Sequence, residues 1–390
     1  MAVNDLTFTQ ISTLLNSIID QATGQTTLAP TNAAEFITVG QSALKTSKDL
    51  LMNSISQVLS KTIISNRPYT RKFKGLEVTQ QQWGAWDRKI SFVDRDFQDN
   101  QRLPLTDGVA IDDQKFVMDH VVQTNFYGKV GYEQRWSITR DQLYDAFQGP
   151  DQFASFISGK LQVMSDQVEQ KNETLARAVI CNLIAGTIAA GNKNQVVHLL
   201  TEYNAATGLD LTNTTVFNPD NYPNFIKWVY ARIAAVSSML TERSSLYHFN
   251  LKDSPVMRHT PEADQRVFMF APNKYQIDAR VLSDVYHDNY LKHAVTEVVN
   301  YWQSIQDPSK INITPVYPNA NGEVISGEAV TINNVFCVIM DRMAAGYTIF
   351  DQHTNVAPYN AAGDYQNYFM KWVDRYINSF DENAVVFLLD

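Results

Sequence analysis

One stretch decides the fold of this chain: residues 149–191, with the sequence GPDQFASFISGKLQVMSDQVEQKNETLARAVICNLIAGTIAAG. Pro150 suits the first position of a helix, where no N–H is needed, and Gly191 suits the left-handed position that ends one. Between them, apolar side chains recur at the spacing of one helical face. They are Phe153, Ile157, Leu161, Met164, Val168, Leu175, Val179 and Leu183. The pattern predicts a helix about 60 Å long, because each residue adds about 1.5 Å.

The opposite face of this helix is polar and predicts contact with water. Its side chains are Gln162, Asp166, Glu169, Glu173 and Arg177. Gly159 and Gly186 weaken a helix, so the sequence leaves open whether the helix is unbroken. A helix of this length is too long for the inside of one compact domain, and we expect it to support the rest of the chain.

The composition is that of a folded protein with more than one domain. The chain has 390 residues, of which 44% are hydrophobic and 19% charged. The net charge of −9 argues against a dedicated nucleic-acid binder, which normally has a basic patch.

Cys181 and Cys337 lie far apart in apolar surroundings and predict reduced packing residues. We find no secretory signal and no apolar run long enough to span a bilayer, so we expect a soluble protein without a membrane partner.

A second strong pattern is the alternation of apolar and polar residues over 116–138. Such alternation predicts a half-exposed strand of about 60–70 Å, at about 3.3 Å per residue. Residues 88–97 are the expected antiparallel partner, and residues 98–113 form a turn-rich tip. A two-stranded ribbon of this length is not stable alone in water. We therefore predict an extended hairpin that reaches across another subunit, with an ordinary hairpin inside a larger sheet as the alternative.

Two groups of side chains are candidate contacts. Those expected to touch a neighbouring subunit are Trp86, Phe92, Phe97, Leu103, Pro104, Phe116, Met118 and Phe126. The dense basic run consists of Arg67, Arg71, Lys72 and Lys74. This run is either a solvated or salt-bridged stretch, or a contact with DNA or with an acidic neighbouring chain.

The remaining segments divide into an arm, a compact domain and a tail. Residues 1–66 contain short amphipathic helices that predict a docking arm without its own core. Residues 206–365 predict a compact α/β domain, in which helices and buried strands follow one another. Residues 384–389 are an apolar terminal strand, which we expect to be buried in a sheet beside strands that flank the long helix.

No motif for catalysis, nucleotide binding or metal binding is present. The best candidate cluster consists of Asp284, His287, Asp288 and His293. The first three have the i, i+3, i+4 spacing of one helix face, as a metal site needs, but such groups are common on solvated helix faces. Asp341 and Arg342 follow a buried strand, where a structural ion pair is the simpler interpretation. His120 and His198 are isolated. His120 falls on the apolar side of the long strand, which predicts a buried imidazole.

The order of these parts resembles the major capsid proteins of tailed bacteriophages with the HK97-type fold. Local similarities are VTINNVFCVIMDRM at residues 330–343 and DENAVVFLLD at residues 381–390. The resemblance implies an α+β fold in which a long spine helix joins a peripheral and an axial domain. The implied parts are an N-terminal helical arm (1–66), an extended β-hairpin with flanking strands (67–140), a peripheral domain with the spine helix (141–205), an axial domain (206–365) and return strands of the peripheral domain (366–390).

The resemblance also implies a structural protein, with no enzymatic activity, cofactor or metal. Its copies would form hexamers and pentamers in an icosahedral shell around double-stranded DNA, as part of a virion assembled in the bacterial cytoplasm. The chain has no N-terminal coiled-coil block like that of some members, so we expect a separate scaffolding protein and no maturation cleavage. A portal, decoration proteins and weakly contacted DNA are the other implied partners. Some members cross-link through a loop lysine, and Lys89 and Lys115 lie in the corresponding segment.

Two alternatives remain open from the sequence. One is an encapsulin-like compartment with the same fold and a protein cargo. The other is a soluble α/β metal-dependent hydrolase that uses Asp284, His287 and Asp341.

Overall fold

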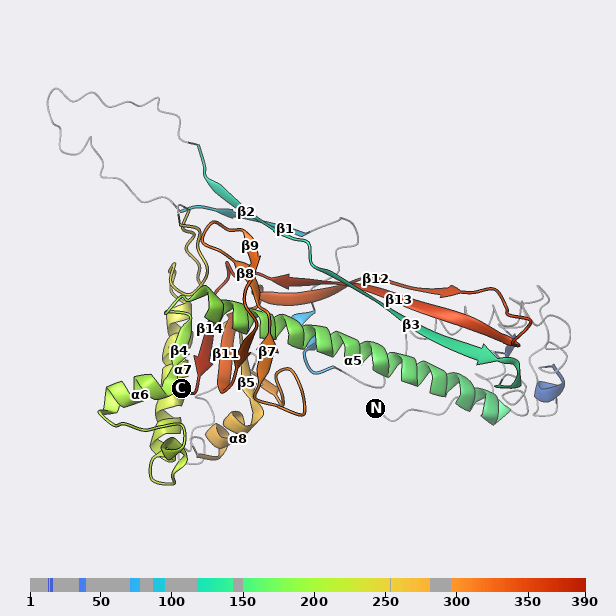
Figure 1. Ribbon diagram of the computed structural model, residues 1–390, viewed down its shortest axis with the longest axis horizontal. Helices are drawn as coiled ribbons and strands as arrows, with labels where there is room; N and C mark the ends of the chain where they lie inside the picture. The colour runs from blue at the N-terminus through green and yellow to red at the C-terminus, as the bar shows by residue number, and fades with distance from the viewer. Residues whose placement is uncertain are drawn as a thin grey trace.

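The computed structural model describes residues 13, 15–16, 35–39, 71–77, 87–94, 118–142, 150–252, 254–280 and 296–390. A compact body of sheet and helices lies at one end, and a long sheet with a long helix extends from it (Figure 1). The long helix is α5 (Pro150–Ala190), which runs through both parts. It is followed by Gly191 with a φ of +71°. The predicted helix and its end are therefore confirmed.

The remaining elements follow in chain order. They are η1 (Lys74–Leu76), β1 (Asp87–Phe92), β2 (Val121–Phe126), β3 (Lys129–Thr139), β4 (Val196–His198), α6 (Leu199–Thr207), η2 (Thr215–Phe217), α7 (Tyr222–Leu240), η3 (Glu262–Asp264), β5 (Gln265–Phe270), α8 (Ala271–Arg280), β6 (Thr296–Val299), β7 (Ile311–Ile313), β8 (Val316–Pro318), β9 (Val324–Ser326), β10 (Val330–Ile332), β11 (Val335–Asp341), β12 (Ala345–Val356), β13 (Tyr365–Asn378) and β14 (Ala384–Leu388).

The body is built on a five-stranded sheet with the order β4-β14-β11-β5-β6. One face of the sheet packs on the second half of α5, through residues such as Phe268 and Val338. The other face packs on α6 and α7, through residues such as Phe336 and Phe387. The sheet is therefore buried on both faces, which explains the continuous apolar runs of its strands.

The terminal strand β14 lies inside this sheet. It pairs in parallel with β4, the strand that follows α5, and antiparallel with β11. All of its residues are buried. The expectation that the chain end returns to a sheet beside the long helix is confirmed. Residues 366–390 do not stay together, however, because β13 belongs to the long sheet and β14 to the body.

The long alternating segment forms two strands instead of one. β2 pairs with β1, whereas β3 pairs with β13 in a three-stranded sheet of order β12-β13-β3. The break falls at Gly128, where a Cβ would lie 2.6 Å from the ring of Tyr376. The predicted antiparallel pairing with the segment that begins at residue 88 is confirmed for β2. The prediction of a single long strand was wrong, because the second part pairs with a strand from the distant C-terminal region.

Three residues of the predicted polar face of α5 are buried, contrary to the sequence-based expectation of contact with water. Glu169, Glu173 and Arg177 are 4%, 5% and 5% exposed. Arg71 donates a hydrogen bond to Glu169 at 3.1 Å and also pairs with Glu77. Arg177 pairs with Glu173 at 2.6 Å, and its guanidinium lies over the ring of Phe73. Segment 71–77 covers this face of the helix with matched charges in place of water.

The helix continues unbroken through Gly186. The glycine is explained by close packing against Phe380. A Cβ at this position would lie 2.5 Å from Cζ of Phe380. The segment Val163–Ala190 is long and apolar enough to cross a membrane by length and composition, which the sequence pattern did not indicate. However, 61% of its apolar window is buried within the protein, as in the core helix of a soluble protein.

We predict that Arg71→Met lowers the free energy of unfolding of the unassembled chain by about 3–5 kcal/mol, because the buried Glu169 loses its cation. Urea denaturation measures this change. Arg135→Met is the control, since Arg135 is 63% exposed and 3.6 Å from Glu133. It should cost no more than about 1 kcal/mol. Equal costs for the two variants would show that the Arg71 pair does not stabilise the covered face.

Candidate assembly surface

The β1–β2 hairpin carries apolar side chains on the face turned to solvent. Phe92 lies directly opposite Val121, and Ile90 lies opposite Gln123, so these residues share one face. Ile90, Phe92 and Val121 are 52%, 67% and 49% exposed, and Met118 beyond the strand is 74% exposed. Grouped exposed apolar side chains of this size indicate an interaction surface. We call Ile90, Phe92 and Val121 the outward face.

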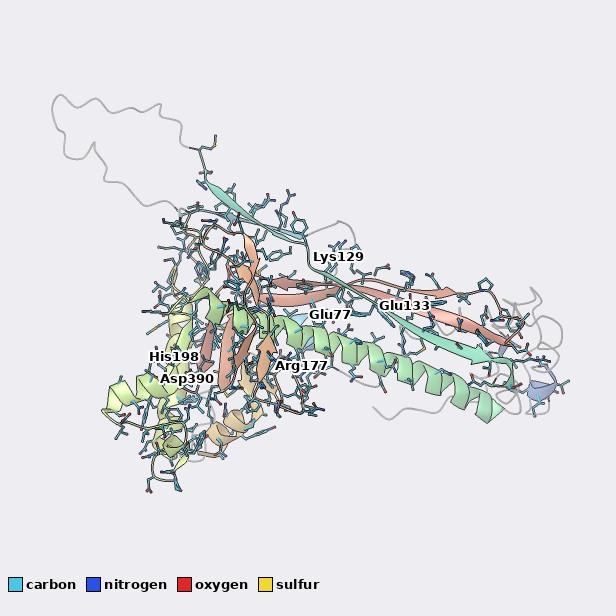
Figure 2. All side chains as sticks on the ribbon, in the orientation of Figure 1. Glu77, Lys129, Glu133, Arg177, His198 and Asp390 are labelled. Carbon is cyan, nitrogen blue, oxygen red and sulfur yellow. The ribbon has the colours of Figure 1, made fainter. Side chains whose placement is uncertain are left out.

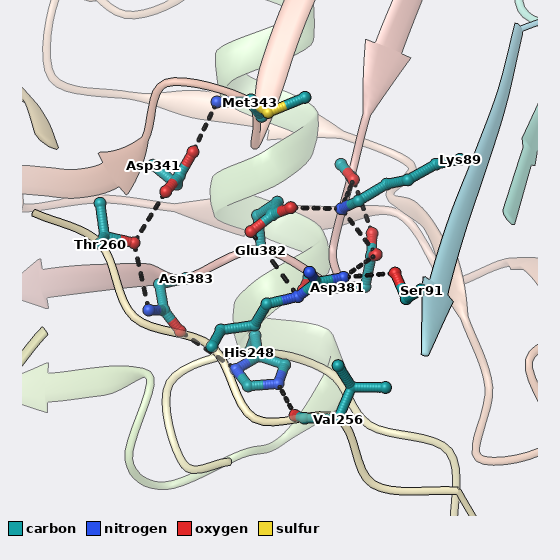
Figure 3. Close-up of polar contacts among 12 residues, drawn as sticks. Lys89, Ser91, His248, Val256, Thr260, Asp341, Met343, Asp381, Glu382 and Asn383 are labelled. Carbon is teal, nitrogen blue, oxygen red and sulfur yellow. Dashed lines mark hydrogen bonds and ion pairs between the residues drawn. The ribbon is translucent and has the colours of Figure 1, made fainter. Parts of the chain in front are cut away.

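The opposite face of β1 is polar and is held to the body by charge. Lys89 Nζ lies 2.7 Å from Asp381 Oδ2 and 2.5 Å from Glu382 Oε1 (Figure 3). Arg258 donates hydrogen bonds to Ser91 Oγ at 2.6 Å and to Asp381 Oδ2 at 3.2 Å. We call Lys89, Arg258, Asp381 and Glu382 the hairpin anchor.

The anchor stabilises the carboxylate of Asp381 in the charged form. Burial alone would raise the pKa of Asp381, but Lys89, a hydrogen bond from Ser379 and the charge of Arg258 together hold that pKa below its usual value. His248 lies in the same region, with Nδ1 3.0 Å from Asn383 Oδ1 and Nε2 2.7 Å from the carbonyl oxygen of Val256. Burial lowers the pKa of His248.

Further polar contacts hold the end of β1 that leads to the tip. Asp94 pairs with Arg243 and accepts a hydrogen bond from the backbone N–H of Met257 at 2.8 Å. His120 lies with Nε2 3.2 Å from Ser254 Oγ. His120 is exposed, so the prediction of a buried imidazole was wrong, because this residue lies beyond the paired part of the hairpin.

The predicted subunit contacts are partly described. Phe92 and Met118 are exposed, and Phe126 is half-buried. The others, Trp86, Phe97, Leu103, Pro104 and Phe116, lie outside the described residues. The sequence pattern placed Val122 and Phe126 on the same face as Met118, whereas the strand register exposes Val121 in place of Val122.

The basic run does not form a patch in the described structure. Arg71 is 2% exposed and pairs with Glu77 and Glu169, so its charge is used inside the chain and it is not a surface contact. Lys72 is exposed. Arg67 and the side chain of Lys74 lie outside what the structure describes.

The candidate catalytic and metal-binding residues are only partly among the described residues. Asp284, His287, Asp288 and His293 lie outside the described residues. Asp341 accepts hydrogen bonds from Thr260 Oγ1 and from the backbone N–H of Met343, both at 2.8 Å, and so holds a turn. Among the described residues, no group of three or more His, Cys, Asp or Glu side chains has metal-binding geometry.

One histidine and two cysteines are the remaining titratable residues that the sequence singled out. His198 lies 2.8 Å from Asp390, where β4 and β14 end side by side (Figure 2). Cys181 and Cys337 are buried free thiols, as predicted. Burial raises the pKa of Cys181 to about 12, so this thiol is not reactive at neutral pH.

Sequence reasoning missed the anchor. Asp381 and Glu382 were visible only as a turn before the terminal strand, and Arg258 only as part of a polar loop. No local pattern connects them to Lys89, because Arg258 and Asp381 follow it by 169 and 292 positions in the sequence. Lys115, the other candidate for a cross-link, lies outside the described residues.

Comparison with known proteins agrees with this architecture. The capsid structure of Staphylococcus phage Andhra superposes with a TM-score of 0.55 at 10% identity, over 84% of this chain and 86% of that one. A structure of the head fiber and inner core protein gp22 of native bacteriophage P68 gives a TM-score of 0.50 at 11% identity, over 82% and 85%. The fold is therefore the HK97-like capsid fold. No curated protein matches the chain.

The sequence comparison is more specific than the structural one. A family model described as "Phi29-like phage major capsid protein" matches residues 15–388, which is nearly the whole chain. The chain therefore belongs to the Phi29-like phage major capsid protein family.

Proposed function

We propose that copies of this chain assemble as hexamers and pentamers into an icosahedral shell that encloses double-stranded DNA. Family membership makes the chain a structural protein of a phage capsid. The capsid is assembled from copies of the chain. The outward face of the hairpin is the observation that carries the finer proposal. A two-stranded ribbon is marginally stable in water, so a surface of a second copy is the natural cover for its apolar side chains.

The size of these contacts suits reversible assembly. Burying a large apolar side chain contributes about 1.5–3 kcal/mol. The outward face therefore supplies only a few kcal/mol per neighbour. Contacts of this strength dissociate when a subunit is misplaced, yet they add up when each copy has several neighbours. A closed lattice is then stable as a whole although each contact is modest.

The charge of the chain supports a weak, non-specific contact with DNA. The net charge is −9, and the buried Arg71 is not available to phosphates. Because protein–DNA affinity depends on phosphate neutralisation, such a wall allows packaged DNA to move in and out. The further partners we propose are a separate scaffolding protein, a portal and decoration proteins, with assembly in the bacterial cytoplasm. We propose no enzymatic activity, cofactor or metal.

Electron microscopy of the expressed chain, alone and with a scaffolding protein, tests this function. We expect closed shells with fivefold and sixfold vertices, and nucleic acid in particles purified from infected cells. Particles that hold protein cargo and no nucleic acid would indicate an encapsulin-like compartment. A monomer under all conditions would contradict the proposed assembly.

We predict that the double variant Ile90→Ser, Phe92→Ser loses shell formation without losing the folded state. Both side chains are more than half exposed, so the free energy of unfolding of the unassembled chain should change by no more than about 1 kcal/mol. Particle yield by sedimentation and urea denaturation are the two measurements. Gln123→Ser is the matched control, because Gln123 is an exposed polar residue on the same face. Normal shells from the double variant would rule out the outward face as a subunit contact.

A further inference from the structure

The hairpin anchor holds β1 in an unusual way. In β1 the polarity is reversed: Lys89 and Ser91 face the body, whereas Ile90 and Phe92 face solvent. An ordinary edge hairpin would place its apolar side chains against its own core. The attachment of β1 to the body therefore depends on charge and hydrogen bonds.

The acceptor side of the anchor is fixed. Asp381 and Glu382 lie in the turn that leads into β14, at the centre of the body. The backbone N–H of Phe249 donates to the carbonyl of Phe380 at 2.8 Å, and the N–H of Asp341 donates to that of Asn383 at 2.8 Å. Asn383 is 1% exposed. This turn cannot shift without disturbing the core sheet.

On the hairpin side, the strands change partner at one junction. β2 continues into β3 through Tyr127 and Gly128, and the strand pairing changes from β1 to β13 at this point. The hairpin extends from this junction away from the long sheet (Figure 1). The anchor lies along the hairpin beyond the junction, since Lys89 is opposite Thr124 in β2. The junction and the anchor, with the contacts of Asp94 and His120 nearer the tip, determine the angle of the hairpin.

We propose that the hairpin anchor is an adjustable ionic joint that sets the angle between the β1–β2 hairpin and the body, and thereby the direction in which the outward face meets a second copy. Coulomb energy falls off only as the inverse of distance, so a small rotation changes the ion-pair energy gradually. Close packing of apolar side chains tolerates much less displacement. The joint therefore lets one sequence present the same face at slightly different angles. This inference rests on the proposed shell, in which hexamers and pentamers require such differences.

A distance measurement on the unassembled full-length chain tests the joint. Spin labels on Gln123→Cys in β2 and Glu262→Cys in η3 report the position of the hairpin relative to the body, and both positions are exposed. The natural thiols, Cys181 and Cys337, are buried and should not react. We expect one narrow distance distribution for the natural anchor and loss of that narrow peak in Lys89→Met. Lys89→Arg should restore it, because the cation is kept.

Lys371→Met is the matched control. Lys371 lies 3.5 Å from Glu133 in an ion pair on the long sheet, away from the hairpin. This variant should keep the narrow peak. An unchanged narrow peak in Lys89→Met would overturn the proposal even if shells form normally. If the natural chain forms no shells, the proposed function fails, whereas the distances in the unassembled chain still decide whether the joint exists.

The same labels test the effect of pH. The charged groups that meet here are the carboxylates Asp381 and Glu382 and the cations Lys89 and Arg258, with His248 beside them. Farther along the hairpin lie the Asp94–Arg243 pair and His120. The pKa of Asp381 is lower in the folded chain, so its contribution is complete above the usual carboxyl pKa of about 4 and is lost as the pH falls through the lowered value.

We therefore predict that the narrow distance peak persists from neutral pH down to about pH 4 and disappears only in stronger acid. Asp381→Asn should lose the narrow distance peak already at neutral pH. Release of the natural hairpin between about pH 7 and pH 5 lies above the carboxyl range and would overturn the assignment to the carboxylates.

Discussion

The length of α5 is the constraint on which the rest of the structure depends. A helix of 41 residues is longer than the body it crosses, so the five-stranded sheet covers only its second half. The first half has to be covered by other elements. The long β12-β13-β3 sheet does this, with Tyr368, Met370 and Trp372 buried on the inner face of β13. The elongated shape therefore follows from one helix and the need to cover its apolar face.

The charged face of the same helix requires a different kind of cover. Glu169, Glu173 and Arg177 lie at low exposure against Arg71 and the ring of Phe73, which pair with or cover these charged side chains. Removing two charges from water is costly, and the cost is offset only where each charge has a partner with good geometry. These pairs tie segment 71–77 to one position along α5.

The sequence predicted the elements whose patterns are local. The 3.6-residue period over 150–190 and the apolar run of β14 were sufficient to place α5 and the buried terminal strand. The alternation over 116–138 correctly predicted β-strand but wrongly predicted a single strand. A two-residue period in the sequence does not show which strand is the pairing partner. The buried face at Glu169 and the contacts of Lys89 also depend on residues distant in the sequence, and no local pattern indicates them.

The two faces of β1 divide the work of a shell subunit between two kinds of force. Apolar contact is strong only at close fit, so in the proposed shell Phe92 would favour one arrangement against its neighbour. The ion pairs of Lys89 would tolerate small changes of angle, so the proposed joint would take up the strain of curvature in place of the contact between copies. If the polarity of β1 were the usual one, the hairpin would be packed rigidly on its own body and every difference between hexamer and pentamer would have to be absorbed at the subunit interface.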